Sequence, residues 1–508
     1  MGGQSAQLVK ILPEKCRSEP TFFKEHQTMT HLNFSFYKPG QVEILKEAVL
    51  HLLEEQGMKL DHHPEIFKAL TSRGFEADSD TGLVKFPRKP MEELLAQAPR
   101  SCLLGALGTN RRLTLPRPDG TFYTRTGTGA HGYLDPETGA YRNVRLSDLA
   151  AWARLINQLD EISFLPFLFS TDVPMQVVDV HGLGTLLKNT DKHVWVQPYS
   201  FESIAYLIRL GTAAAGGSRA LADNPLISMI ACSLTPRAFK HMDLEVIWQS
   251  ARAGLPIHAC SLPGIGSTSP ATLPGTIVLA CSEILAMVVM AQAVSPGTPV
   301  IACPIIFSTD MTSGRSLQSS VESMKCAAGA VQFLKTAFNL PTHNYGSGTD
   351  SPVQDGQAVG ERTLLSTLMT LSGLDILGGA GQLEVATAVS PIQLILDNEI
   401  FGMLRKLKAD FTLDEDQLAT QVLSDISPGN HFLATKHTLQ HCRDGFLPRH
   451  FTRSARNIWE QEGSRDLFHR IQDSYHGLMA KENVFGADEN TVLEIDGIIQ
   501  SAEEELVK

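Results

Sequence analysis

One polar, glycine-rich segment holds the residues best suited to chemistry in this chain, residues 346–358 (GSGTDSPVQDGQA). It contains two aspartates and two glutamines, follows a short apolar run that ends at Tyr345, and leads into a helical pattern. A loop of this kind between a buried strand and a helix is where a (β/α)8 barrel keeps its catalytic groups. An ordinary connection between strand and helix is the alternative for any single loop.

Three aromatic residues, Tyr199, Phe307 and Tyr345, follow other apolar runs and would face the same mouth. The strand ends carry few positive charges. Aromatic faces with nearby carboxylates attract a quaternary ammonium ion and gain little from a phosphate. The alternative is that these rings fill the barrel, since aromatic rings pack most cores.

Carboxylates also follow the strands, and we expect Asp172, Asp350 and Glu384 at the mouth. Asp350, Asp355 and Glu384 are the candidates for acid or base chemistry. Asp355 stands directly before a helix and is expected to cap it. His343 lies inside an apolar run, where a buried neutral histidine is the default, although its strand points at the same mouth.

The elements that position these residues are short apolar runs separated by helical stretches. Continuous apolar strands that alternate with helices predict a parallel sheet buried on both faces. Seven or eight such units predict a closed (β/α)8 TIM barrel, with an open doubly wound sheet as the alternative. The runs are residues 164–169, 193–196, 226–231, 257–260, 300–303, 342–345 and 374–377.

The flanking segments differ from the barrel pattern, and they predict three domains. Residues 1–145 are expected to form a helical cap with an antiparallel β patch, which includes strand 121–126 and a hairpin at 133–141. Residues 146–412 would form the catalytic barrel, and residues 413–508 a helical appendage.

Composition excludes several functions. The 508 residues are 43% hydrophobic and carry a net charge of −12 without a basic block, which argues against a nucleic-acid partner. The eight cysteines lack the spacing of metal ligands, so we expect no metal site and a reducing cytoplasm. No secretory signal is visible, and the apolar residues 275–293 are interpreted as a core helix rather than a membrane span.

Residues 127–132 (GTGAHG) formally match a dinucleotide-binding fingerprint. In that motif a helix follows the glycines and its N-terminus binds the pyrophosphate. Here a predicted hairpin follows instead, so we reject a dinucleotide site and interpret the glycines as turn residues.

Several motifs, taken in order, resemble the trimethylamine methyltransferase family. They are residues 348–358 and 378–384 (GGAGQLE), followed by residues 393–400 (QLILDNEI). Residues 427–433 (SPGNHFL) with residues 437–441 (HTLQH) resemble its C-terminal signature. Further matches are residues 134–139 and 295–300.

The resemblance implies a (β/α)8 barrel and methyl transfer from an amine to cobalt, between cob(I)alamin and methylcobalamin carried by a partner corrinoid protein. Founding members carry pyrrolysine in the loop that corresponds to residues 345–351, and this chain has ordinary residues there. It therefore resembles the branch without pyrrolysine that demethylates quaternary amines. We expect glycine betaine, with proline betaine, carnitine and γ-butyrobetaine as alternatives, and a homo-oligomer without a membrane partner.

The chemistry suits a quaternary amine because its nitrogen already carries the positive charge and needs no proton to leave. The three aromatic rings would then form a cage around the cation. His343, Gln357 and Asp172 are the remaining expected substrate contacts, and Gly348 would open space where pyrrolysine stands in the founding members. The expected catalytic group is Tyr345, Gly348, Asp350 and Glu384.

Two other functions stay open. A barrel lyase or aldolase would need a Schiff-base lysine or a metal cluster at a strand end, and neither is visible. A non-catalytic barrel that binds a betaine would keep the ligand site but transfer no methyl group.

Overall fold

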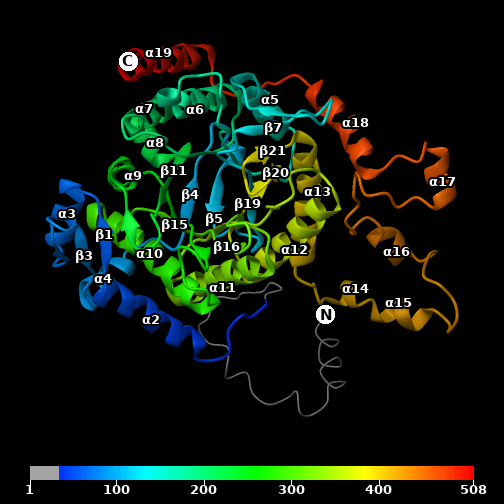
Figure 1. Ribbon diagram of the computed structural model, residues 1–508. Coiled ribbons are helices and arrows are strands. Elements are labelled where there is room, and N and C mark those ends of the chain that lie inside the picture. Colours follow the sequence, from blue (N-terminus) through cyan, green and yellow to red (C-terminus); the bar gives the residue numbers. More distant parts are fainter. Residues whose placement is uncertain (1–33, 508) are drawn as a thin grey trace, which may run out of the picture.

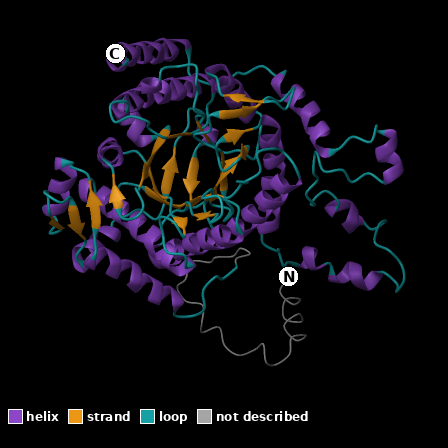
Figure 2. Cartoon of the chain, viewed as in Figure 1, coloured by secondary structure: helices purple, strands orange, loops and turns teal. Residues whose placement is uncertain are grey.

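The computed structural model describes residues 34–507. One of the eight cysteines, Cys16, lies outside the described part. A ring of strands occupies the centre, and helices surround it (Figures 1 and 2). The ring strands are β6 (Tyr123–Thr126), β9 (Leu165–Pro166), β10 (Val194–Val196), β11 (Ile227–Cys232), β13 (Ile257–Ser261), β15 (Val300–Pro304), β18 (His343–Tyr345) and β19 (Ile376–Ala380).

The strand pairs close this ring. Strands β9, β10, β11, β13 and β15 form one parallel sheet, and β18, β19 and β6 form another. Parallel bridges from Arg125 to Phe164 and from Ala302 to Thr342 join the two sheets at both edges. Eight parallel strands thus pair in a complete circle, which confirms the predicted (β/α)8 barrel.

The first strand of the ring was assigned wrongly. We placed residues 121–126 in an antiparallel patch, whereas β6 pairs in parallel with β19. Its alternation of polar residues is typical of a strand with one solvated face, but Arg125 is fully buried inside the ring. The ring therefore begins before residue 146, and the division into three domains stays a prediction.

Helices cover the outside of the ring. The longest, α10, is apolar and buried along most of its length, and it packs against α2, α9 and α11. It is the one described helix long and apolar enough to cross a membrane, and its burial is that of a core helix. The covering helices are α5 (Leu146–Asn157), α6 (Val178–Asn189), α7 (Ile204–Ala215), α8 (Ser218–Asp223), α9 (His241–Ala253), α10 (Leu273–Val294), α11 (Val321–Phe338), α12 (Gly356–Ser372) and α13 (Pro391–Lys408).

The amino end of the barrel is closed by the antiparallel hairpin of β4 (Cys102–Leu104) and β5 (Leu113–Leu115). Its apolar side chains join one core cluster with the inward-facing residues of the barrel strands. The Gly105 N–H donates to the Pro225 carbonyl just before β11, which holds the hairpin at this end. Any ligand must therefore enter from the opposite, carboxyl end.

The segment before this hairpin packs beside α10. Its small sheet pairs with β12 of the barrel region. Its elements are α2 (Gln41–Glu55), β1 (Met58–Leu60), α3 (Pro64–Thr71), β2 (Glu76–Ala77), β3 (Leu83–Lys85), α4 (Arg88–Leu95) and β12 (Ala238–Phe239).

Two small sheets built from the loops flank the carboxyl end. The predicted hairpin at 133–141 is confirmed as β7 and β8. The glycines at 127–132 lead into a strand and not into a helix, which agrees with the rejection of a dinucleotide site. The first sheet contains β14 (Gly264–Ile265), β16 (Phe307–Thr309) and β17 (Ser316–Leu317). The second contains β20 (Gln382–Leu383), β21 (Ala388–Val389), β7 (Gly132–Leu134) and β8 (Tyr141–Asn143).

After α13 the chain extends away from the barrel through residues 409–455, which we call the arm. It then returns to the barrel, as the orange and red segments of Figure 1 show. The last two helices pack on the barrel, α18 against α5 and α13, and α19 against α6 and α7. The elements are α14 (Glu415–Leu418), α15 (Thr420–Asp425), α16 (Lys436–His441), α17 (Arg456–Gln461), α18 (Leu467–Met479) and α19 (Glu489–Leu506).

A fully buried ion pair ties the mouth loops to the helices behind them. The Arg362 guanidinium of α12 donates to the Asp397 carboxylate of α13 at 2.6 Å. It also donates to the carbonyls of Ser347 and Gln382, and Asp397 accepts from the Gly381 N–H. Two loops and two helices thus meet at one charge pair.

The pair predicts a large stability effect. Arg362→Met leaves an uncompensated buried carboxylate, and we expect the free energy of unfolding to fall by about 3–5 kcal/mol. Adding Asp397→Leu removes that orphaned charge and should recover part of the loss. The exposed pair of Arg219 and Asp223 provides the control, because Arg219→Met should cost less than about 1 kcal/mol. Urea unfolding measures all four proteins; equal losses for Arg362→Met and Arg219→Met would contradict the prediction.

Three buried histidines predict acid sensitivity. Burial lowers the pKa of His193 to about 4, and burial with the nearby charge of Arg125 lowers the pKa of His258 and His343 well below 6.5. Below pH 6.5 these three histidines stay neutral in the folded protein but take up protons in the unfolded chain. Their contribution to the free energy of unfolding is therefore complete above pH 6.5 and is lost as pH falls toward the folded pKa values.

Between pH 6.5 and 5.5 we expect the free energy of unfolding to fall by about 3 kcal/mol from these three groups together. His258→Gln has one such group fewer and should lose about 1 kcal/mol less over the same range. Urea titrations at several pH values provide the measurement. A free energy that stays constant over this range would contradict the prediction, because it would show that the folded and unfolded chains take up equal numbers of protons.

Candidate functional site

A buried arginine without a counter-charge lies at the carboxyl end of the barrel. The Arg125 Nε donates to His343 Nε2 at 2.7 Å, and Nη1 donates to the Thr126 carbonyl at 2.6 Å. The guanidinium lies 4.2 Å from the Trp195 ring centroid and 4.1 Å from that of Tyr345. Nη2 is buried without a partner, and no ion pair to Arg125 is found among residues 34–507. A buried guanidinium with an unpaired nitrogen would be stabilised by a bound anion.

More unpartnered polar atoms lie on neighbouring elements. The Thr126 hydroxyl, the Trp195 indole N–H and both amide atoms of Gln382 are buried without hydrogen-bond partners. Gln382 lies over the strand ends, because a Cβ on Gly127 would come within 2.0 Å of its Cγ and one on Gly379 within 2.8 Å of its Oε1. These groups can hold a small ligand that accepts hydrogen bonds.

The glycine motif at 378–381 makes room for this arrangement. A Cβ on Gly378 would lie 2.8 Å from Arg125 Cζ and 2.9 Å from His343 Nε2, so no other residue fits beside the guanidinium. Gly381 has φ +78°, and a Cβ there would meet the Trp152 ring at 2.5 Å. The motif that the sequence singled out therefore serves close packing around Arg125.

His343 lies inside the barrel below the mouth. Its ring is fully buried and lies 3.2 Å from both His258 Nδ1 and Cys303 Sγ. Because burial and the Arg125 charge lower the pKa of His343, the imidazole is neutral, and it can accept the Arg125 Nε–H. His343 thus orients the guanidinium, and the expected direct contact with substrate stays a prediction.

The carboxyl end also has an open cavity of about 500 Å³. It brings together Phe307 and Glu384, as predicted, from the two flanking sheets. Arg315, on the loop between β16 and β17, lines it too, although we expected few positive charges here. No motif surrounds Arg315, so the sequence offered no signal for it. The remaining lining residues are Ser316, Val385 and Thr387.

Glu384 lies on the tip of a strained hairpin at this cavity. Glu384, Val385 and Ala386 all have positive φ, 51°, 53° and 68°. Such φ values cost roughly 1–2 kcal/mol per residue. The Glu384 and Val385 N–H groups donate to the carbonyls of Ser351 and Thr349, which stabilises the tip. Strain held in place beside a cavity is typical of functional sites.

The expected aromatic cage is only partly supported. Phe307 lines the cavity, but one face of Tyr345 is covered by Arg125, and Tyr345 is largely part of the interior core. Tyr199 packs edge-on against Phe169 at 4.9 Å and lies near the Gly129 turn. Tyr345 therefore cannot offer that face to a substrate cation, because the guanidinium already occupies it.

Gly348 and Asp350 both contact the segment after β17. A Cβ on Gly348 would lie 2.3 Å from Gln318 Cδ, so the space expected to be open there is filled by Gln318. The Asp350 carboxylate accepts from the N–H groups of Gln318 and Ser319 at 2.8 and 3.2 Å. Burial raises the pKa of Asp350. These contacts hold the loop, and a catalytic role for either residue stays a prediction.

Three other predicted positions lie outside the cavity. Gln357 is exposed on α12 and donates to Glu361, and Asp172 is exposed and accepts from the Leu146 N–H at the start of α5. Asp355 caps α12 by accepting from the Ala358 N–H, as expected. Neither side chain lines the cavity, because Gln357 faces solvent from the first turn of α12, and Asp172, in the loop between β9 and α6, is held by the Leu146 N–H.

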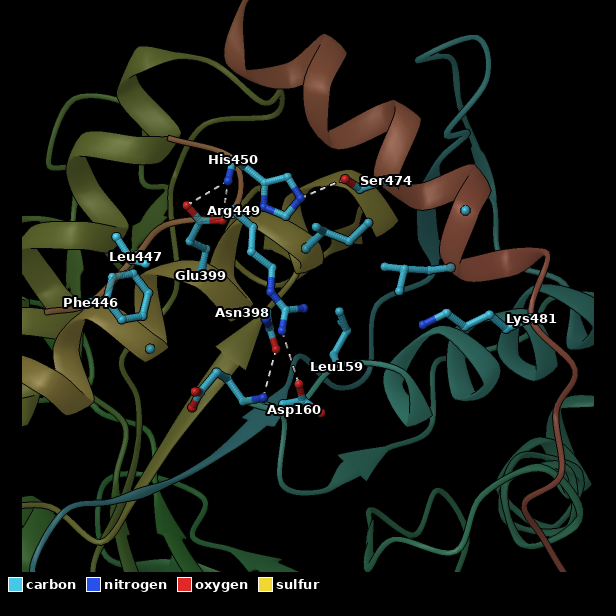
Figure 3. Close-up of a pocket in the computed structure, with 15 residues that line it drawn as sticks. Leu159, Asp160, Asn398, Glu399, Phe446, Leu447, Arg449, His450, Ser474 and Lys481 are labelled. Carbon is cyan, nitrogen blue, oxygen red and sulfur yellow. Dashed lines mark hydrogen bonds and ion pairs between the residues drawn. The ribbon is translucent and has the colours of Figure 1, made fainter. Parts of the chain in front are cut away.

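A second cavity, of about 530 Å³, lies elsewhere, between α13, the loop before β9 and the C-terminal segment. Figure 3 shows His450 between Glu399 and Ser474 in this cavity, and its nitrogens lie 2.5 Å from Glu399 Oε2 and 2.9 Å from Ser474 Oγ. Asp160 on its wall precedes β9, so the cavity is near the amino end of the barrel. We interpret it as the seam where the C-terminal segment packs on the barrel.

Residues 14–506 match the family model described as trimethylamine methyltransferase. A protein of Desulfitobacterium hafniense named trimethylamine methyltransferase is 28% identical over 92% of this chain and 94% of its own length. One from Methanosarcina barkeri is 28% identical over 93% and 96%. A Desulfitobacterium hafniense protein named glycine betaine methyltransferase is 29% identical over 84% and 89%.

Among solved structures, the Methanosarcina barkeri monomethylamine methyltransferase covers 92% of this chain with 13% identity and a TM-score of 0.45. The barrel assignment rests on the strand pairing above. The expectation of a methyltransferase is confirmed by the family match across nearly the whole sequence. This chain belongs to the trimethylamine methyltransferase family.

Proposed function

We propose that this enzyme transfers a methyl group from a quaternary amine that carries a carboxylate, with glycine betaine as the leading substrate, to the Co(I) corrinoid of a partner protein. Family membership supports the kind of reaction. The relative named glycine betaine methyltransferase supports this choice of substrate. The unpaired guanidinium of Arg125 is the single observation that carries the proposal for this chain.

A carboxylate is the ligand that this guanidinium lacks. Arginine and carboxylate form charge-assisted hydrogen bonds with matched planar geometry. A betaine brings such a group, whereas trimethylamine does not and would leave Arg125 without a counter-charge. The buried donors of Thr126, Trp195 and Gln382 add further partners for the carboxylate oxygens.

The charges also orient the substrate. A cationic nitrogen is repelled by Arg125 and attracted by aromatic faces and carboxylates, so the trimethylammonium end points outward to the cavity lined by Phe307 and Glu384. A methyl group then faces the open mouth, where a cobalt atom on another protein can approach.

The chemical step needs no proton. The methyl carbon forms a bond to the acceptor cobalt while its bond to nitrogen breaks, and that electron pair stays on nitrogen. The leaving group is a neutral tertiary amine, here dimethylglycine. The protein therefore contributes orientation and a water-poor environment, and it does not need a general acid. This fits a barrel interior whose histidines are neutral.

Arg125→Gln tests the carboxylate contact. We expect its kcat/KM with glycine betaine to fall about 100-fold, since hydrogen bonds to charged groups contribute roughly 1.5–3 kcal/mol. The assay follows methylcobalamin formation from added cob(I)alamin with glycine betaine, proline betaine, carnitine, γ-butyrobetaine and choline. Choline lacks a carboxylate, so its low rate should not fall further in the variant.

Arg315→Gln is the matched control, because Arg315 is also an arginine at the carboxyl end of the barrel, but it lines the open cavity and is exposed and solvated. It should change the rate by less than about fivefold. Wild-type activity in Arg125→Gln with glycine betaine would overturn the carboxylate contact. If the wild-type protein binds a betaine but transfers no methyl group, the chain is a non-catalytic binding barrel instead.

Phe307→Ala tests the outward position of the cation. A lost cation–π contact is worth about 0.5–2 kcal/mol, which predicts a KM for glycine betaine raised roughly 2- to 30-fold. Phe201→Ala removes an aromatic ring that packs on His241 away from the cavity, and it should leave the KM unchanged. An equal KM in both variants would place the ammonium group away from Phe307.

A further inference from the structure

The arm after α13 lacks a core of its own. The short helices α14 and α16, of four and six residues, contain no buried residue. Isolated helices of this length are unstable in water, and small units without a core usually need a staple such as a metal ion. The arm contains the C-terminal motif of residues 427–433 and 437–441. The proposed methyl transfer does not use this motif.

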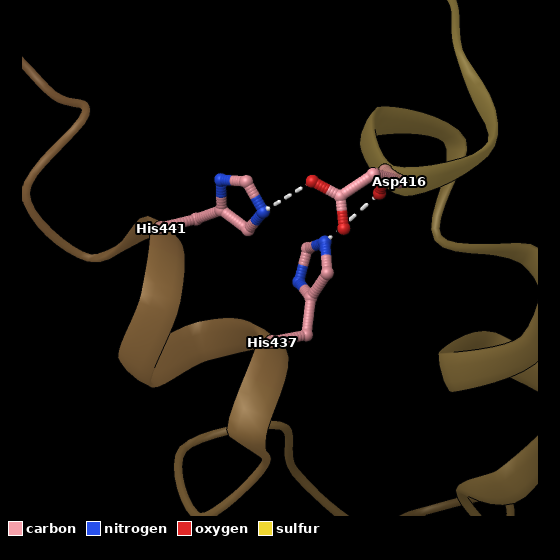
Figure 4. Close-up of side chains that lie close together, drawn as sticks. All are labelled: Asp416, His437 and His441. Carbon is pink, nitrogen blue, oxygen red and sulfur yellow. Dashed lines mark hydrogen bonds and ion pairs between the residues drawn. The ribbon is translucent and has the colours of Figure 1, made fainter.

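Three side chains with metal-binding atoms converge in this arm. His437 and His441 lie one turn apart on α16, and Asp416 comes from α14 (Figure 4). His441 Nε2 lies 3.0 Å from Asp416 Oδ2, and His437 Nε2 lies 3.1 Å from the Asp416 carbonyl oxygen. The ligand atoms of the three residues all lie within 4.8 Å of one another.

We propose that Asp416, His437 and His441 bind one divalent transition-metal ion, for which zinc is the best fit. Zinc–nitrogen and zinc–oxygen bonds of about 2.0–2.2 Å place tetrahedral ligand atoms about 3.3–3.6 Å apart, close to the separation of His441 from Asp416. Two imidazoles with one carboxylate suit zinc, whereas calcium and magnesium prefer oxygen ligands. A water molecule would complete the four ligands.

A fourth residue supports the site from outside. Asp444 Oδ2 lies 2.6 Å from His441 Nδ1, so this carboxylate can accept a hydrogen bond from the Nδ1–H while Nε2 faces Asp416. A histidine that binds a metal usually donates its other ring N–H to a carboxylate or carbonyl in this way. The contact fixes the tautomer that metal binding at Nε2 requires.

The bound ion would connect α14 to α16 across about twenty residues of chain. Since neither helix buries a side chain, that connection would account for their defined relative position. The site lies in the arm and shares no residue with the mouth around Arg125, so its role is structural. Cysteine spacing had suggested no metal site; the signal was the His-x3-His spacing of residues 437–441.

Metal binding is measured on the full chain, without a histidine tag, after removal of metal by a chelator. We expect the wild-type protein to take up one Zn²⁺ per chain, and Co²⁺ to give the visible absorption of a four-coordinate site. His437→Gln, His441→Gln and Asp416→Asn should each lower the affinity at least 100-fold, and Asp444→Asn about 10- to 100-fold. His469→Gln, exposed on α18, is the control and should bind as the wild type does.

Limited proteolysis gives a second readout that needs no variant. Residues 409–455 of the wild-type protein should be cleaved faster after chelation and protected again by Zn²⁺, while methyl transfer stays unchanged. Uptake of less than one metal ion per chain, equal uptake in His441→Gln and His469→Gln, or cleavage of the arm that does not depend on Zn²⁺ would each overturn the proposal.

Discussion

A buried guanidinium without a counter-charge is the constraint around which the barrel interior is organised. Arg125 lies between the Trp195 and Tyr345 rings, and neutral His343 accepts a hydrogen bond from its Nε–H. The absence of a side chain at Gly378 leaves the room that the guanidinium occupies. The hairpin of β4 and β5 closes the amino end, so the unpaired Nη2 can meet an anion only from the mouth side.

The loops of the mouth are fixed independently of the ligand. The pair of Arg362 and Asp397 ties two of them to α12 and α13, and the strained tip that begins at Glu384 is hydrogen bonded to the loop at 346–351. A site that works by orientation needs this rigidity, because misplacing the methyl carbon by about 1 Å slows such reactions by a large factor. A buried unpaired cation, with an open cavity lined by Phe307 and Glu384 at the same end of the barrel, provides partners for the two ends of a zwitterion.

Much of the fold could be predicted from the sequence, because apolar runs separated by helices are a strong signal for parallel strands. Seven of the eight strands lie at the predicted runs. The eighth, β6, was predicted as a strand but placed in the antiparallel patch, because it alternates polar residues and contains Arg125, and a charged residue is normally evidence against a buried strand. The residue that argued against a barrel strand is the same one that reveals the site.

The candidate site could be predicted only in part. Phe307 and Glu384 were found because both directly follow barrel strands, where position along the chain indicates the mouth. Gln357 and Asp172 were misplaced, since helix rotation turns Gln357 toward solvent and a loop contact with the Leu146 N–H holds Asp172. Gln318 fills the space beside Gly348 from a different loop, and sequence distance gives no sign of that contact.

A crystal structure with bound glycine betaine tests the role of Arg125 most directly, because it shows where the carboxylate lies. We predict a carboxylate oxygen within about 3 Å of Arg125 Nη2 and the trimethylammonium group toward Phe307. A carboxylate bound at Arg315, with Nη2 of Arg125 still unpaired, would contradict this assignment.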